Sequence, residues 1–152
     1  MTVIEIKQSL LQECKNVVQR RYEKINQTLT DIIESLEDES KSSAGDKHET
    51  GRAMLQIDRE NAGKQLAEVE QLQKLLPKID IKSTSDYARL GSLVYTNHGT
   101  FFIGISTGAF TVGKTVYYCV ALQAPIGKLL SGKKKSDSFS FNDKQYLITS
   151  IK

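Results

Sequence analysis

The sequence predicts an α+β protein in which a long antiparallel pair of helices precedes a small β domain. Apolar residues recur every three or four positions through the first half, and no Gly or Pro interrupts that half before Gly45. After Gly91 the pattern changes to alternating aromatic and β-branched residues. A chain of 152 residues can form one ordinary domain or two small ones. We therefore expect a coiled-coil pair over 1–76, a linker over 77–90 and a β domain over 91–152.

The first helix is expected over about residues 3–39. Its apolar positions follow a near-heptad spacing and are Leu11, Cys14, Val18, Tyr22, Ile25, Leu29, Ile32 and Leu36. The return helix ends at Pro77, because proline blocks continuation of a helix. Its apolar positions are Met54, Ile57, Leu66, Val69, Leu72, Leu75 and Leu76. Each helix is apolar on one side only, and the short connection makes the two helices antiparallel partners.

The β domain is expected to be a twisted antiparallel sheet covered by one short helix. Its strands are predicted at 92–95, 100–106, 115–122, 138–141 and 146–151. The helix is predicted over 125–130, with Pro125 at the favoured first position and Gly132 after its end.

Composition and charge restrict the class of protein. The net charge of +3 combines −3 over residues 1–76 with +6 over 77–152, so an acidic half precedes a basic half. No apolar run of 18 residues and no secretory signal are evident, and we expect neither a membrane partner nor export. Cys14 and Cys119 have no metal-binding or disulfide spacing, which fits a reducing cytoplasm. Neither a nucleotide-binding glycine loop nor a Ser/His/Asp arrangement is present.

The turn between the helices carries the strongest chemical signal. Residues 31–49 contain seven carboxylates and two lysines, a local net charge of −5, and the acidic tip is expected near 38–50. Asp46 and Glu49 are three residues apart at the start of a helix, so they lie on one face and can converge on one cation. Helix capping is the alternative, with Asp46 as N-cap and Glu49 completing a capping box. His48 is expected to be a solvated loop residue.

Three segments resemble one known family. The tip reads GDKHET over 45–50, a second segment reads APIGKLLSGKKKSD over 124–137, and GSLV occupies 91–94. These segments, in this order, resemble the bacterial Gre transcript-cleavage factors (GreA/GreB type). The resemblance covers essentially the whole chain and implies an FKBP-like fold for the β domain. The family has Asn after the tip Glu, where this chain has Thr50 followed by Gly51.

The resemblance implies a function in transcription elongation. Gre factors place their helical tip in the secondary channel of RNA polymerase, near the RNA 3′ end, and stimulate cleavage of backtracked RNA. By position, Asp46 would help to hold a second Mg²⁺ and Glu49 would orient the attacking water or share the ligation. The Mg²⁺ is shared with the polymerase, so the free protein needs no cofactor and is not an enzyme by itself. Lys133, Lys134 and Lys135 would dock on the polymerase or RNA, or serve solubility only.

Two other functions stay open at this point. One is a Gre-like polymerase regulator without cleavage activity, which the changed residues after the tip favour. The other is a protein-interaction adaptor that does not bind polymerase at all. In each case we expect a cytoplasmic monomer.

Overall fold

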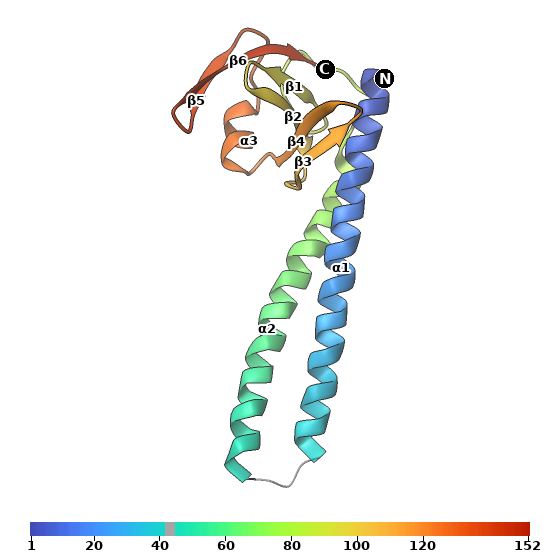
Figure 1. Cartoon of the computed structure of the whole chain (residues 1–152), viewed down its shortest axis with the longest axis vertical. Helices are drawn as coiled ribbons and strands as arrows, with labels where there is room; N and C mark the ends of the chain where they lie inside the picture. The colour runs from blue at the N-terminus through green and yellow to red at the C-terminus, as the bar shows by residue number, and fades with distance from the viewer. Residues whose placement is uncertain (42–44) are drawn as a thin grey trace. The chain divides into compact units, whose positions relative to one another are not determined.

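The structure, a computed structural model, describes the backbone of residues 1–41 and 45–152, with side chains over 1–41 and 49–152. It confirms the α+β class: two long helices, α1 (Val3–Lys41) and α2 (Gly45–Leu75), precede a sheet and one short helix (Figure 1). The chain divides into two compact units. The β unit combines Met1–Val17 with Leu75–Lys152, and the helical unit is Val18–Lys74.

The helical unit is an antiparallel pair with a narrow apolar seam. Its two helices lie side by side, and the part of α1 from Val18 onward is about 36 Å long (Figure 1). The described part of the seam includes Leu29, Ile32, Leu36, Leu55 and Ala62. None of the helices in the described part of the chain is long and apolar enough to cross a membrane.

The predicted seam of the return helix was partly wrong. Met54 and Ile57 are 63% and 57% exposed, and Leu55 and Ala62 pack against α1 instead. Successive residues lie about 100° apart around a helix, so Met54 and Leu55 cannot both face α1, and the sequence pattern did not show which of them does. Ala62, which weakens the pattern by its small size, is 5% exposed, since a small side chain lets the two helices approach.

The β unit contains a six-stranded sheet. Its strands are β1 (Leu93–Thr96), β2 (Gly99–Gly104), β3 (Gly108–Val112), β4 (Thr115–Ala121), β5 (Ser138–Phe141) and β6 (Lys144–Ile151). Their order is β3-β4-β2-β1-β6-β5. A one-turn helix η1 (Leu76–Lys78) and a short helix α3 (Pro125–Leu130) complete the unit.

The expectation of a wholly antiparallel sheet was wrong at one pair of strands. β2 and β4 are parallel, with Phe102 opposite Cys119, whereas the other paired strands are antiparallel. The strand β3 was not predicted from the sequence. It follows β2 and precedes β4 along the chain, and it pairs antiparallel with β4 at the edge of the sheet. An additional reversal of direction therefore makes β4 parallel to β2.

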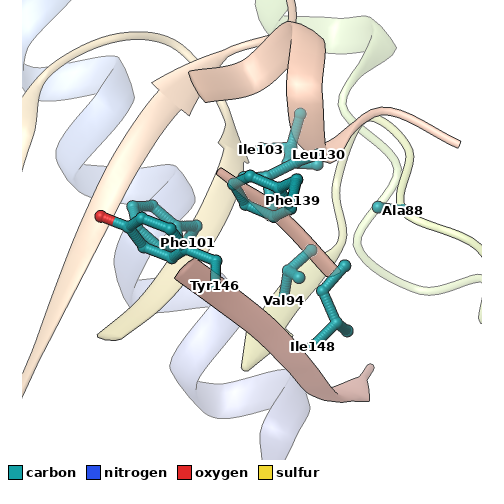
Figure 2. Close-up of a cluster of buried hydrophobic side chains, with 8 residues drawn as sticks. All are labelled: Ala88, Val94, Phe101, Ile103, Leu130, Phe139, Tyr146 and Ile148. Carbon is teal, nitrogen blue, oxygen red and sulfur yellow. The ribbon is translucent and has the colours of Figure 1, made fainter. Parts of the chain in front are cut away.

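One face of the sheet packs beneath α3. The buried cluster on this face consists of Ala88, Val94, Phe101, Ile103, Leu130, Phe139, Tyr146 and Ile148 (Figure 2). The rings of Phe139 and Tyr146 are stacked, with centroids 5.0 Å apart. The two-residue turn Asn142–Asp143 has positive φ at both positions, as a type I′ hairpin requires, and joins β5 to β6.

The opposite face of the sheet packs against the first turns of α1. Phe102, Leu93 and Cys119 point to this face and are at most 1% exposed, and Leu10 and Cys14 of α1 are fully buried. Cys14 was expected in the seam between the two long helices, but its thiol contacts Cys119 of the sheet. The sheet is therefore covered on both faces, by α3 and by the start of α1.

Candidate functional site

The candidate site is the end of the helical pair at which α2 begins. Helix α2 begins at Gly45, so Asp46 lies within its first turn and does not precede the helix as an N-cap would. Asp46 and Glu49 are three residues apart along this helix, which places them on one face. The side chain of Glu49 is exposed. Residues 42–44, and the side chains of Asp46 and His48, lie outside the described part of the structure.

A hydrogen bond links the two helices close to this end. Arg52 of α2 donates from its guanidinium to the hydroxyl of Ser40 of α1. Ser40 in turn donates to the carbonyl oxygen of Leu36, at 2.9 Å. The second turn of α2 is thus tied to the last turns of α1, and this link fixes the position of the helix that carries Glu49.

The end of the Glu39 side chain lies close to Gly51. A Cβ atom at this position would lie 3.2 Å from Oε1 of Glu39, closer than ordinary van der Waals contact. Gly51 costs helix stability, so its presence inside α2 fits a need for space next to Glu39. Neither Gly51 nor Arg52 was predicted as a site residue. The signal in the sequence was Gly51 itself, a glycine within a helical pattern across the turn from the acidic run 37–39.

The charge at this end of the helical pair is strongly negative. Asp31, Glu34, Glu37 and Asp38 are exposed on α1, and the stretch 31–49 carries a net charge of −5. Exposed carboxylates within a Debye length of one another, about 8 Å at physiological salt, create a field that attracts cations. This end of the pair is therefore suited to a cationic surface or to a metal ion held elsewhere.

Asp46 and Glu49 alone supply too few ligands for a metal. Among the side chains that the structure describes, no group of three or more His, Cys, Asp or Glu residues could hold an ion. Mg²⁺ requires six oxygen ligands in octahedral geometry, and Asp46 with Glu49 supplies two carboxylates. Carboxylates are the right chemical type, and Glu49 is accessible. The tip residues thus fit a role of completing the coordination of an ion that a partner already holds.

The three lysines after α3 are not equivalent. The backbone carbonyl of Lys133 accepts a hydrogen bond from Ala88 at 2.8 Å, and Lys134 forms an isolated β-bridge with Tyr87. The ammonium of Lys134 lies 3.9 Å from the carboxylate of Asp86, in an exposed ion pair worth little. Lys135 is exposed. This basic loop is therefore anchored through its backbone, and its charged groups reach the surface.

The two thiols form a second chemical cluster, in the β unit. Cys14 and Cys119 are buried, and a hydrogen bond from the Cys119 thiol lowers the pKa of Cys14 to about 7. The same hydrogen bond and burial raise the pKa of Cys119. The buried hydroxyl of Thr107 adjoins both sulfurs. Buried thiols are inert toward large reagents, so we assign this pair to packing of α1 on the sheet.

No protein family model matches this chain, and no curated protein sequence matches it. The residues quoted above therefore carry the family resemblance by themselves.

Proposed function

We propose that this chain is an RNA polymerase-binding elongation factor of the Gre type, which stimulates cleavage of backtracked RNA. The observation that carries the proposal is the exposed Glu49 at the start of α2, one turn from Asp46, at the strongly acidic end of a narrow helical pair. A narrow pair of helices is a shape that can enter a channel. The motif GDKHET over 45–50 matches the Gre tip in its glycine and in the spacing of both carboxylates.

The proposed chemistry uses the two carboxylates together. Asp46 contributes oxygen to an ion held mainly by the polymerase, and Glu49 orients or deprotonates a water molecule beside the scissile phosphate. A Mg²⁺ ion supplies charge neutralisation of the phosphate oxygens when it is bound. The hydrogen bond from Arg52 to Ser40 ties the second turn of α2 to α1, which keeps Glu49 in position.

Exposed apolar residues on the helical pair support a binding partner for this unit. Ile33, Met54 and Ile57 are 41%, 63% and 57% exposed. Single exposed apolar residues need no explanation, but three large ones on the same helical pair are available for contact with a partner. We propose that they contact the walls of the polymerase channel, with Lys133, Lys134 and Lys135 as a second contact.

A transcript-cleavage assay tests the proposal. Halted, backtracked elongation complexes of the cognate polymerase are incubated with Mg²⁺ and the protein, and short 3′ RNA fragments are measured. We expect Asp46→Asn and Glu49→Gln each to lower the cleavage rate by about 100-fold or more, the range of a lost general base. Glu34→Gln is the matched control, since it removes an exposed carboxylate from the same unit, and its rate should stay within about twofold. Unchanged cleavage by the Asp46→Asn/Glu49→Gln double variant would end the proposal.

A regulator without cleavage activity is the second candidate. It is favoured by Thr50 and Gly51, which replace the residues that follow the tip Glu in the Gre family. Such a protein would bind core polymerase and slow cleavage by an authentic Gre factor, but it would release no RNA fragments. If neither binding nor competition is seen, the adaptor hypothesis becomes the better one.

A further inference from the structure

A pocket in the β unit lies between the start of α1, the segment that follows η1 and the end of β6. Its volume is about 460 Å³, within the range of small-molecule sites. Figure 1 marks both ends of the chain near the start of α1, and both contribute to the walls. Most of the wall is aliphatic, from Val3, Ile4, Ile81 and Ile151.

A buried cation lines this pocket. Lys7 of α1 is 2% exposed, although lysine is almost never buried without a partner. The structure gives its ammonium no ion pair and no hydrogen bond among the residues that it describes. Desolvation of the largely buried side chain and the nearby Arg89 lower the pKa of Lys7, as expected of an ammonium that has lost part of its water shell and has no close counter-ion.

The nearest acidic group is engaged elsewhere. Asp80 raises the pKa of Lys7, but its effect is smaller than the opposing effect of Arg89. The carboxylate of Asp80 accepts hydrogen bonds from the backbone N–H groups of Lys82 and Ser83, at 2.9 and 3.1 Å. It therefore stabilises its own turn and leaves the Lys7 ammonium without a close counter-ion.

The remaining charged side chains at the pocket are also positive. Lys82 and Lys152 line it together with Lys7, and none of its lining residues has an acidic side chain. An anion entering the pocket would meet three lysines, one of them buried. Interactions of a buried charge with an incoming counter-ion are strong because water no longer screens them.

We propose that this pocket binds a small aliphatic carboxylate, with its charged end on Lys7 and its hydrocarbon tail against Val3, Ile4, Ile81 and Ile151. A carboxylate fits better than a phosphate, which is usually held by several convergent donors. The pocket offers the ammonium of one largely buried lysine beside an aliphatic wall. This inference does not depend on the proposed role in transcription.

The test is a titration of the full chain with octanoate, followed by NMR of the isoleucine methyl groups. We expect a dissociation constant of about 1 mM or below, with shifts at Ile4, Ile81 and Ile151. Ile33 and Ile57 of the helical unit should not shift and serve as internal controls. Octanol and octylammonium share the tail without the negative charge, and each should bind at least about tenfold more weakly.

Two series sharpen the assignment. Lys7→Met keeps the length of the side chain and removes the charge, so octanoate should bind about 10- to 100-fold more weakly while octanol is unaffected. Lys128→Met, away from the pocket, is the matched control and should bind octanoate normally. Across butanoate, hexanoate and octanoate, each added methylene should tighten binding by up to about fourfold. Methyl shifts of the unmodified protein test the site even if Lys7→Met does not fold.

Several results would overturn the proposal. If octanol bound as tightly as octanoate, binding would come from apolar contact alone, without a contribution from the carboxylate. If Lys7→Met bound octanoate as tightly as the unmodified protein, the Lys7 ammonium would not be part of the binding site. Absence of methyl shifts at Ile4, Ile81 and Ile151 at 10 mM octanoate, on the order of ten times the expected dissociation constant, would leave no ligand site of this class here.

Discussion

The two units of this protein differ in how they are held together. The β unit has a sheet covered on both faces, with Phe102, Leu93 and Ile103 completely buried. In the helical unit, one packed cluster of α1 and α2 consists of Ile32, Leu36 and Ala62 with two half-buried leucines, and Val18 and Val69 are buried as well. Apolar burial is the main stabilising contribution to folding, so the β unit holds most of the stability.

The difference separates stability from proposed activity. The residues to which we assign the cleavage chemistry are on the thinly packed helical unit, with its net charge of −5 over 31–49. Like charges held close together oppose compact packing. Repulsion between the carboxylates therefore lowers the stability of the helical unit where we propose that these carboxylates act. The core of the β unit contains no such cluster of like charges among the described residues.

The largest expected effect concerns the core of the β unit. Phe102→Ala should lower the free energy of unfolding by about 3–5 kcal/mol, because it leaves a cavity in a fully buried site. Denaturant titration followed by tyrosine fluorescence measures this, since five of the six tyrosines are in the β unit. Val116→Ala, at a side chain that is 43% exposed, should change the free energy by less than about 1 kcal/mol. A similar loss for the two variants would contradict the assignment of the core.

The next effect concerns Gly91, which packs against the backbone of Asp80 in the segment before the sheet. Gly91 has φ +93, and a Cβ atom there would lie 2.0 Å from the carbonyl oxygen of Asp80. Gly91→Ala should therefore cost about 3 kcal/mol of stability, from backbone strain and overlap together. Gly113→Ala is the control, because φ is +64 but the space is open, and about 1 kcal/mol is expected. Equal thermal stabilities of the two variants would show that the contact with Asp80 is unimportant.

A core substitution in the helical unit should act locally. Leu36→Ala, at a site that is 7% exposed, should cost about 2 kcal/mol, at the lower end for leucine, because the seam is narrow. In a thermal melt of Leu36→Ala, the helix signal measured by far-UV circular dichroism should disappear at a lower temperature than in the natural protein. The midpoint of the tyrosine fluorescence transition, which reports the β unit, should not change. Ile33→Ala, at a side chain that is 41% exposed, serves as the control. One shared transition in all variants would mean that the two units unfold as one.

The smallest expected effect is a pH dependence in the turn that contains Asp80. Hydrogen bonds from the side chain and backbone of Ser83, and from the backbone of Lys82, lower the pKa of Asp80 from 3.8 to about 2. Its stabilising contribution is present above about pH 4 and is lost as the pH falls toward 2. The difference in melting temperature between the natural protein and Asp80→Asn should therefore shrink over this range. A difference that is constant from pH 5 to 2 would exclude the charge as its cause.

Much of the fold followed from periodicity, which reports how residues are spaced along each element. The end of α2 before Pro77, the bounds of α3 and the strand β5 were predicted closely. Periodicity does not report which partner covers a face. For this reason Cys14 was placed between the two helices, although it packs on the sheet against Cys119.

The missed strand has a similar explanation. β3 contains Gly108 and Ala109, which have low strand propensity, and it ends at a turn, so its sequence resembles a loop. Its hydrogen bonds to β4 stabilise it as a strand. At the candidate site, the sequence indicated Asp46 and Glu49 but not the link from Arg52 to Ser40. That link joins residues on different helices, and only the alignment of the two helices brings them together.

The split of α1 between the two units has a consequence for synthesis on the ribosome. The helical unit, Val18–Lys74, can form once its own residues have emerged. The first turns of α1 must wait for Cys119 and the rest of β4, about a hundred residues later, which takes roughly 5–20 s at ordinary translation rates. During that interval the apolar side of these turns, including Leu10 and Cys14, has no sheet to cover it. We therefore expect these turns of the nascent chain to be open to a chaperone that binds exposed apolar helices until β4 has formed.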